Sequence, residues 1–281
     1  MRLYQWSKNI LLGVPVLTAH AFDLRSLGAV MIAFVAFGCI ASATYLLNVL
    51  IDLHADRRHP QKCRRPFAAG DLSLSTGLVV MGVLLGAGIA LAAFQSLSFL
   101  LMVLAYLALT LGYSLFLKSL VLLDVLVLAA LYTVRIMAGA VAIQVQMSSW
   151  LLAFSMFTFL SLALVKRGSE LVTMERISRG AASDRDYRVS DYNMVTTMGV
   201  AAGYLSVVVL ALFVDSPQGR AAYARPGLLW LLCPLMLYWV SRLWIKTGRG
   251  QMHDDPLMFS LRDRTSWMVV AAMVLVVLAA I

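Results

Sequence analysis

Charged side chains are scarce in this sequence. They make up 13% of its 281 residues, whereas apolar side chains make up 61%. A water-soluble globule needs far more polar surface than this composition supplies. Apolar runs of about 20 residues, the length that crosses a bilayer, recur along the whole chain. The sequence is therefore that of a polytopic membrane protein and not of a soluble domain with one anchor.

Cysteine and histidine are also rare. The three cysteines, Cys39, Cys63 and Cys233, are far apart and two of them lie in apolar runs, so we expect neither a disulfide nor a zinc site. The four histidines form no visible catalytic dyad. The sequence thus gives no sign of a thiol, zinc or histidine centre.

The apolar pattern predicts nine membrane-spanning helices in a single domain over residues 1–281. They are expected at 9–24, 28–53, 75–94, 97–117, 121–143, 149–173, 193–214, 226–246 and 265–281. Each span must be a helix because lipid offers the backbone no hydrogen-bond partner, and no alternation of period two indicates a barrel. No small-residue cleavage site follows the first apolar run, so we interpret it as a retained helix. The expected class is all-α.

Lysine and arginine are distributed unevenly between the two predicted sides of the membrane. One side holds only Arg25, Arg220 and Arg225, and Arg135 lies within a span. The rest of the 23 lie on the side of the N-terminus. This bias predicts that the N-terminus and the charged loops face the cytoplasm. The net charge of +9 also suits anionic lipid, which accounts for part of the cations but not for the carboxylates among them.

The stretch NVLIDLHADRRHPQKCRRP, residues 48–66, interrupts an apolar run with acids, amides and cations. Asn48, Asp52 and Asp56 are four residues apart, which keeps them near one face of a helix. Oxygen ligands on one face favour Mg²⁺, which binds one or two carboxylates and completes its shell with water and phosphates. Cations suited to phosphate follow directly: Arg57, Arg58, Lys62, Arg64 and Arg65.

This spacing predicts a Mg²⁺-diphosphate site with Asp52 and Asp56 as its catalytic carboxylates. The alternative is a helix end where acids and bases neutralise one another at the interface. Ionisable groups that continue back into an apolar run are costly, which favours the site.

The same residues resemble the first Asp-rich motif of the UbiA superfamily of intramembrane prenyltransferases. The continuation, residues 56–62 and 65–70, is similar to its decaprenyl-phosphate phosphoribosyltransferase branch. Further segments that resemble this branch are Arg2 with Gln5-Trp6 and Lys8-Asn9, Tyr113-Ser114, Leu117-Lys118, Asp124, Arg135 with Ala138-Gly139, Lys166-Arg167 with Glu170, Tyr187-Arg188, His253-Asp254-Asp255-Pro256 and Arg262-Asp263-Arg264. The resemblance implies a nine-helix bundle in the inner (cytoplasmic) membrane of a bacterium, with Mg²⁺ as cofactor. One departure is Val49, where the family usually has Asp; if that carboxylate binds metal in relatives, its loss weakens Mg²⁺ binding here.

The prenyl donors of ordinary family members lead us to expect a second Asp-rich motif after the sixth helix. This chain has LALVKRGSELVTMERI there, and a polar loop follows. The residues that we expect to bind substrate in these segments are Lys166, Arg167, Glu170, Arg185, Tyr187 and Arg188. Only one carboxylate, Glu170, stands in the helical repeat where two or more would help to hold a second Mg²⁺, so the cation pair suits a phosphate better than a second metal. The alternatives are a positively charged helix end and a solvated connector.

We therefore expect a transferase that moves 5-phosphoribose from phosphoribosyl diphosphate to a polyprenyl phosphate. Mg²⁺ would neutralise the leaving diphosphate while C1 of ribose passes through an oxocarbenium-like state. The polyprenyl phosphate is already anionic, so it needs no strong base to attack C1 with inversion. The expected partners are these two substrates and membrane lipids, with no nucleic acid; the Gly82 and Gly86 spacing leaves a homo-oligomer open.

Three further cations are candidates for phosphate binding. Lys8 and Lys118 lie at predicted helix ends, and Lys118 near Asp124 has the alternative role of an interfacial anchor. Arg135 is about halfway along an apolar helix and should face the bundle interior. Before the last helix, Asp255 and Pro256 favour a helix-capping turn over a metal site.

Two other functions compete with this prediction. A prenyltransferase would move an isoprenoid from a prenyl diphosphate to an aromatic or lipid acceptor. A transporter or flippase would be expected to show paired interrupted helices in internal repeats, and we find no such pair.

Overall fold

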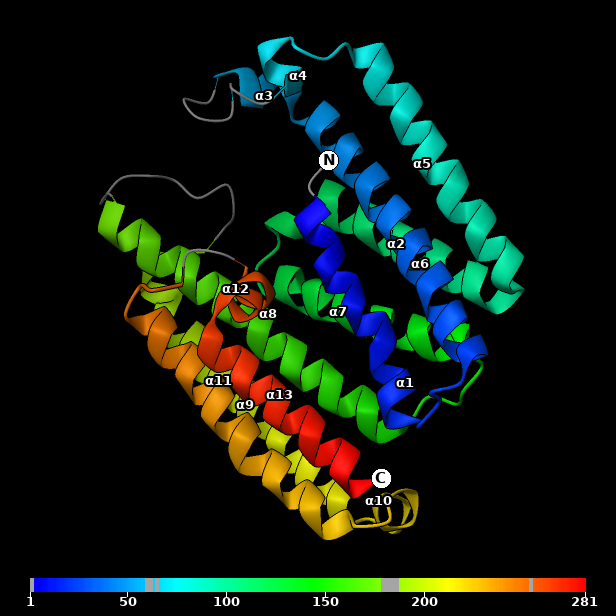
Figure 1. The fold of residues 1–281 in the computed structure, drawn as a ribbon. Coiled ribbons are helices and arrows are strands. Elements are labelled where there is room, and N and C mark those ends of the chain that lie inside the picture. The colour runs from blue at the N-terminus through cyan, green and yellow to red at the C-terminus, as the bar shows by residue number, and fades with distance from the viewer. Residues whose placement is uncertain (1–2, 59–62, 64–65, 178–186, 253–254) are drawn as a thin grey trace. The chain divides into compact units, whose positions relative to one another are not determined.

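The computed structural model describes residues 3–58, 63, 66–177, 187–252 and 255–281. Every regular element in these ranges is a helix, which confirms the all-α class (Figure 1). The chain divides into two compact units. Unit 1 comprises Met1–Leu115 and Val134–Gln146, and unit 2 comprises Phe116–Thr133 and Met147–Ile281. Helix α7 contributes its first half to unit 2 and its second half to unit 1.

Seven helical segments are long and apolar enough to cross a membrane. They are α2 (Leu24–Ile51), α5 (Leu74–Gln95), α6 (Leu97–Leu115), α7 (Leu123–Ala142), α8 (Ser149–Ile177), α9 (Tyr192–Asp215) and η5 (Pro226–Leu231) with α11 (Leu232–Gly248). An eighth arises if α12 (Pro256–Arg262) and α13 (Arg264–Ala280), which meet at an angle of 88°, form one broken span. The described residues therefore do not confirm the predicted count of nine. Short helices connect these spans: α3 (Leu53–Arg58), α4 (Pro66–Ala69), η3 (Leu117–Ser119), η4 (Val189–Asp191) and α10 (Pro217–Ala222).

The first predicted span is not a long α-helix. η1 (Leu3–Gly13) is a 3-10 helix, and α1 (Val14–Thr18) adds five residues. Pro15 at the start of α1 has no backbone N–H to continue the hydrogen-bond ladder from η1, so the helix changes type there.

Polar side chains fix where the spans begin. Asp23 caps α2 by accepting a hydrogen bond from the Ser26 backbone N–H at 3.0 Å. Ser73 caps α5 by accepting from the Thr76 N–H at 3.1 Å. Such caps satisfy backbone donors that have no partner within the helix.

In unit 1, η1 and α5 both pack on α2, and α5 runs alongside α2 (Figure 1). Trp6 Nε1 donates to Ser42 Oγ at 3.0 Å, and Asn9 Nδ2 donates to the Phe34 carbonyl at 3.3 Å. A Cβ added at Gly38 would lie 2.8 Å from the Trp6 ring. A small residue at this point lets η1 lie close to α2, as is usual between helices in membranes.

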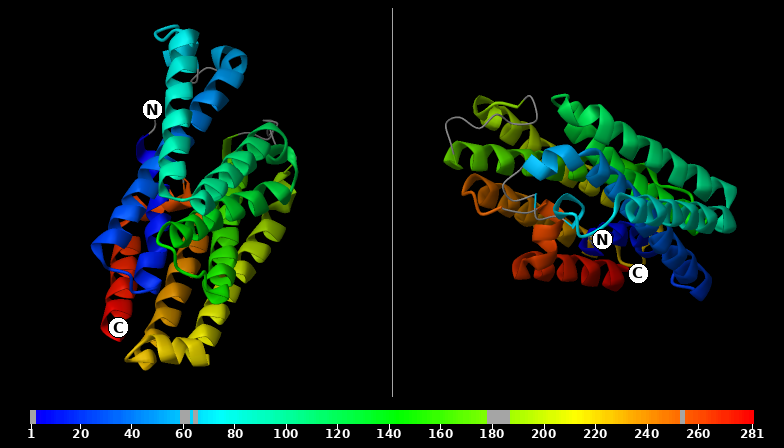
Figure 2. Two further views of the ribbon diagram at one scale, coloured as in Figure 1. Left: turned by 90° about the vertical axis from the view of Figure 1, so that its right-hand side faces the viewer. Right: turned by 90° about the horizontal axis from the view of Figure 1, so that it is seen from above.

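In unit 2, α8 and α9 pack along their length and α11 packs on both (Figure 2). Ser161 Oγ donates to the Gly199 carbonyl at 2.7 Å and accepts from Trp244 Nε1 at 3.1 Å. The absence of a Cβ at Gly199 makes room for the Trp244 ring. These bonds join three helices where lipid supplies no alternative partner.

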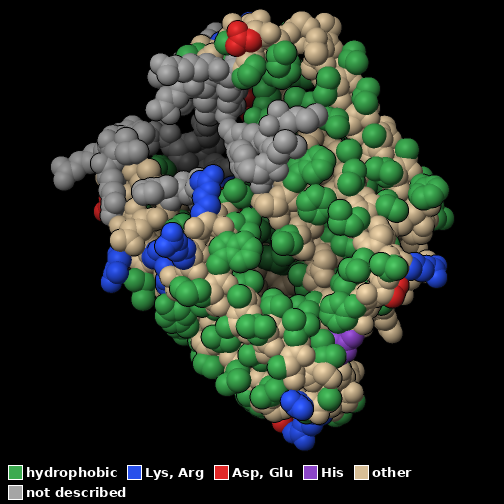
Figure 3. Space-filling view, viewed as in Figure 1, with side chains coloured by type: hydrophobic (Ala, Val, Ile, Leu, Met, Phe, Trp, Pro, Cys, Tyr) green, Lys and Arg blue, Asp and Glu red, His purple; other side chains and the backbone are tan. Residues whose placement is uncertain are grey.

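Apolar side chains also cover the outside of the helices. Exposed examples are Leu24, Val79, Phe94, Met194 and Leu275. In Figure 3, hydrophobic side chains are spread over the face outside the grey residues, and charged side chains are few. An exposed apolar surface of this extent suits contact with lipid. The chain is an integral membrane protein.

Candidate functional site

The predicted metal motif begins in the last turn of α2. Asn48 is half-buried, and its Nδ2 donates to Ser114 Oγ of α6 at 3.1 Å. Asp52 follows the helix, where its backbone N–H still donates to the Asn48 carbonyl at 2.9 Å, and its side chain is exposed. Because the Asn48 NH₂ group is held by Ser114, the amide oxygen remains the group suited to a cation. These two residues fit a Mg²⁺ site of oxygen ligands, one helical turn apart.

The motif does not lie on one uninterrupted helix, as the spacing alone suggested. α2 ends at Ile51, and α3 begins at Leu53 after a turn at Asp52. The backbone of Asp56 and Arg58 is in α3, but their side chains are outside the described part of the structure, as are Lys62, Arg65 and Arg185 altogether. Arg57 in α3 is exposed.

Val49 lies on a different face of α2 from Asn48. It is 5% exposed and belongs to an apolar cluster with Leu46, Leu53 and Phe67. A carboxylate here would be buried among apolar side chains at a cost of several kcal/mol, on the order of the transfer penalties for unpaired polar groups. The departure from the family motif therefore matches the packing around α2 in this chain.

Arg135 is buried in unit 1, as its position in an apolar helix predicts. It is 6% exposed. Its Nη2 donates to Tyr106 Oη at 2.6 Å, its Nε donates to Asn9 Oδ1 at 3.4 Å, and its Cζ lies 4.8 Å from the Tyr106 ring centroid. These contacts pair the cation with a phenol, an amide and an aromatic face.

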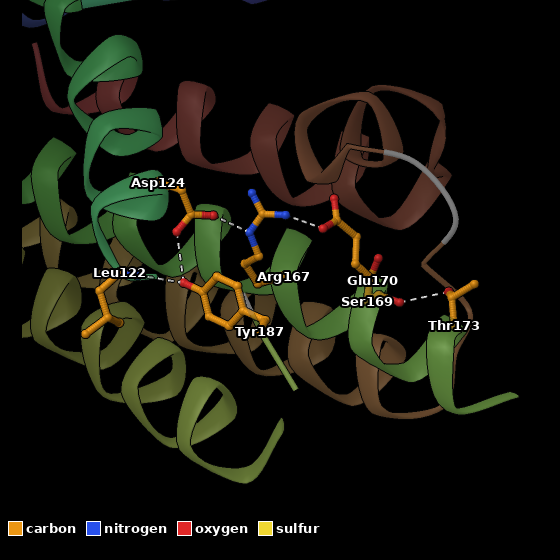
Figure 4. Close-up of polar contacts among 7 residues, drawn as sticks. All are labelled: Leu122, Asp124, Arg167, Ser169, Glu170, Thr173 and Tyr187. Carbon is orange, nitrogen blue, oxygen red and sulfur yellow. Dashed lines mark hydrogen bonds and ion pairs between the residues drawn. The ribbon is translucent and has the colours of Figure 1, made fainter. Parts of the chain in front are cut away.

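Unit 2 contains a buried network centred on Arg167, which is shown in Figure 4. Arg167 is 1% exposed, and its Nε donates to Oδ2 of Asp124, itself fully buried, at 2.5 Å. Arg167 Nη1 also pairs with Glu170 Oε2, one turn further along α8. The guanidinium lies 5.6 Å from the Tyr187 ring centroid. The arginine predicted as a phosphate ligand is thus held between two carboxylates.

Tyr187 hydrogen-bonds to the same buried carboxylate as Arg167. Its Oη donates to Asp124 Oδ1 at 2.9 Å and accepts from the Leu122 backbone N–H at 3.0 Å. Leu122 has a φ of 67°, a left-handed conformation that is uncommon for a branched side chain. Burial raises the pKa of the Tyr187 phenol to about 12, and the Asp124 carboxylate acts in the same direction.

A second group of polar side chains in unit 2 lies around Lys166. Lys166 is half-buried and lines a small cavity with Tyr132 and Asp255. Tyr132 Oη donates to Asp255 Oδ2 at 3.3 Å. Asp255 also accepts from the Leu257 backbone N–H at 3.2 Å, which confirms the predicted helix-capping role before Pro256.

The remaining predicted cations are less enclosed. Lys8 in η1 is half-buried, Lys118 in η3 is exposed, and Arg188 at the start of η4 is exposed.

Three pairs of side chains that contact each other in the structure were not predicted from the sequence. Asp124 was not matched with Arg167, Tyr132 was not matched with Asp255, and Tyr106 was not matched with Arg135. A carboxylate at the start of an apolar helix does signal a buried cation elsewhere, but it does not say which one.

The model of the UbiA prenyltransferase family matches residues 10–261. The chain belongs to the UbiA prenyltransferase family. It is similar over its whole length to a solved UbiA homologue from Archaeoglobus fulgidus bound to DMAPP and Mg²⁺, with a TM-score of 0.72 and 16% identity over 99% of this chain and 96% of that one. The fold is therefore UbiA-like.

Three similar proteins from bacteria bear on the function. Protein y4nM of Sinorhizobium fredii is 38% identical and covers 96% of this chain, which spans 52% of the length of y4nM. Nodulation protein NoeC of Azorhizobium caulinodans is 36% identical over 98% of this chain and 89% of NoeC. Decaprenyl-phosphate phosphoribosyltransferase of Mycobacterium tuberculosis is 30% identical over 100% of this chain and 92% of that protein.

Proposed function

We propose that this membrane transferase moves 5-phosphoribose from phosphoribosyl diphosphate to a polyprenyl phosphate and releases diphosphate. Residues 1–281 act in this proposal as one transferase domain in the inner membrane of a bacterium, with the N-terminus in the cytoplasm. Asn48, Asp52 and Asp56 would hold Mg²⁺, which would supply positive charge to the leaving diphosphate. The similarity to a decaprenyl-phosphate phosphoribosyltransferase over the full chain supports this choice of reaction.

The ion pair between Arg167 and Glu170 is the observation that carries the proposal. Glu170 is the one carboxylate in the helical repeat beside Lys166 and Arg167, where a second Asp-rich motif is expected, and Arg167 pairs with it directly. A carboxylate paired with a guanidinium is a poor ligand for a second Mg²⁺, while Lys166 beside it supplies a positive charge. Such a segment suits the 5-phosphate of a sugar donor, which a prenyl diphosphate lacks.

The residues of this chain act in the reaction by binding and orienting groups. Arg58, Lys62 and Arg65 follow the metal motif and bind the leaving diphosphate. Lys166, with Lys8, Lys118, Arg185 and Arg188, binds the phosphates of the donor and the acceptor. An acceptor phosphate oxygen forms the new bond to C1 of ribose as the bond from C1 to the diphosphate oxygen breaks, and no side chain needs to remove a proton.

The test is transfer of label from phosphoribosyl diphosphate into decaprenyl phosphate by the purified protein in nanodiscs with Mg²⁺. We expect transfer that stops with EDTA and falls at least a hundredfold in Asp52→Asn and at least tenfold in Lys166→Met. Asp71→Asn and Arg25→Gln change exposed charges outside the proposed site and should leave the rate unchanged. Transfer that persists in EDTA or in Asp52→Asn would contradict the proposal.

A second candidate is prenyl transfer from a prenyl diphosphate. The UbiA homologue described as bound to DMAPP and Mg²⁺ supports it, because its fold is shared along the whole chain. Product formed from geranyl diphosphate or a longer prenyl diphosphate, with none from phosphoribosyl diphosphate, would show that the reaction is prenyl transfer.

A further inference from the structure

Lys166 and Glu170 lie on the same face of α8. They are four residues apart, which is about 6 Å along a helix axis. A half-buried cation and a carboxylate at this separation offer one group for a phosphate and one acceptor for hydroxyl groups. A 5-phosphoribosyl group carries both chemical features, a phosphate at C5 and hydroxyls at C2 and C3.

The side chain of Glu170 is paired with Arg167 and is partly exposed. Arg167 Nη1 contacts Oε2, and the side chain of Glu170 is 42% exposed, whereas that of Arg167 is 1% exposed (Figure 4). Arg167 cannot reach a soluble ligand from this buried position without breaking its pairs. The group that meets a substrate on this face is therefore the carboxylate and not the guanidinium.

The orientation of Arg167 is fixed by residues far away in the sequence. Asp124 accepts from Arg167 Nε at 2.5 Å and from Tyr187 Oη at 2.9 Å. The Tyr187 hydroxyl is held in turn by the Leu122 backbone N–H at 3.0 Å. A buried carboxylate with two such donors leaves the guanidinium little freedom to turn.

We propose that Glu170 accepts hydrogen bonds from the ribose hydroxyls of the donor and that Asp124 positions it through Arg167. This inference rests on the proposed function and adds a reason for selecting ribose. Carboxylates that accept from ribose hydroxyls are a recurrent solution in nucleotide-binding folds. Asp124 and Arg167 are positioning residues here, and Glu170 is the residue that contacts the sugar.

The first experiment compares kcat/KM for phosphoribosyl diphosphate with kcat/KM for its 2-deoxy and 3-deoxy analogues. We expect the wild-type protein to prefer the full donor over at least one analogue by about tenfold or more. Glu170→Gln should lower kcat/KM for the full donor and leave that for the analogue unchanged, so that the preference disappears. Glu175→Gln, an exposed acid on the same helix, should keep the preference.

The positioning role predicts the same loss of preference in Asp124→Asn. Because this variant leaves Arg167 with one fewer charged partner and can fold poorly, Tyr187→Phe provides a milder change that removes the hydroxyl contacts to Asp124 and to the Leu122 N–H. We expect Tyr187→Phe to weaken the preference by a few fold. An equal fall for the full donor and the analogues in all three variants would indicate a structural role and would overturn the inference.

Binding gives a readout that does not depend on transfer. Calorimetry in nanodiscs would compare ribose 5-phosphate with 2-deoxyribose 5-phosphate and 3-deoxyribose 5-phosphate on the wild type and on Glu170→Gln. Tighter binding of ribose 5-phosphate that Glu170→Gln abolishes supports the inference, even if the proposed transfer fails. Equal binding of the three sugars, or none, overturns it, even if phosphoribosyl transfer is observed.

Discussion

At the scale of single residues, burial decides what each charge does. The sequence places Arg167 beside Lys166 and predicts the same role for both, but Arg167 is 1% exposed and Lys166 is half-buried. The difference comes from Asp124, which lies 43 residues away and needs a buried cation. No local pattern gives this pairing, because it depends on how α7 and α8 pack within unit 2.

The same scale yields a prediction for Tyr187. The phenol has a pKa of about 12 in the folded protein against 10.0 ordinarily, so the folded state favours the neutral form. Its contribution to stability is therefore complete below pH 10 and is lost as the pH rises through 12. At pH 11 the loss should be of the order of 1 kcal/mol. The measurement is thermal unfolding in detergent between pH 8 and pH 11.

The control removes the titrating group. In Tyr187→Phe the Tm should start lower at pH 8 and fall less steeply with pH than in the wild type. The Tm of Tyr238→Phe, which changes an exposed tyrosine, should fall with pH as the Tm of the wild type does. Parallel curves for wild type and Tyr187→Phe would show that this phenol does not titrate as proposed.

At the scale of elements, most helix positions follow from the sequence, and their breaks do not. The predicted helices at 75–94 and 149–173 are observed as α5 (Leu74–Gln95) and α8 (Ser149–Ile177). The bend between α12 and α13 was not predicted. Asp263 stabilises the bend in two ways. It caps α13 by accepting a hydrogen bond from the Ser266 N–H at 2.8 Å, and it accepts hydrogen bonds from both terminal nitrogens of Arg242 at 2.6 and 2.9 Å.

Glycines allow a prediction about helix contacts in unit 1. A Cβ at Gly139 of α7 would lie 2.2 Å from the Leu12 carbonyl oxygen, whereas a Cβ at Gly82 of α5 meets nothing within 4 Å. Gly139→Ala should therefore lower stability by about 1 to 3 kcal/mol, because backbone must move. Gly82→Ala should leave it unchanged or raise it slightly, since alanine favours helix.

The two variants form a matched pair, each adding one methyl group to a helical glycine. Thermal unfolding monitored by size-exclusion chromatography in detergent gives the comparison. A Tm for Gly139→Ala at or above that of Gly82→Ala would contradict the close approach of η1 to α7.

At the scale of the whole molecule, the bias of lysine and arginine predicts its orientation in the membrane. Asp71 lies in the loop between α4 and α5 on the cation-rich side, and Ala221 lies in α10 on the side with Arg220 and Arg225. Both positions are exposed. In a background with Cys39, Cys63 and Cys233 replaced by alanine, a membrane-impermeant maleimide should label Ala221→Cys in intact bacterial cells.

The matching variant Asp71→Cys should react only after the cells are permeabilised. Labelling of Asp71→Cys in intact cells, with Ala221→Cys protected, would reverse the predicted orientation. Equal labelling of both would indicate insertion in two orientations.

The sequence by itself determined the class of this protein, because composition and apolar run length are properties of the chain that any fold must satisfy. It also determined the family, through motifs spread along the chain from Arg2 to Arg264. Tertiary structure alone decided which charges are buried together: Asp124 with Arg167 and Tyr187, and Arg135 with Asn9 and Tyr106. These hydrogen-bonded partners lie between 29 and 126 residues apart in the sequence, and only packing brings their side chains within hydrogen-bond distance.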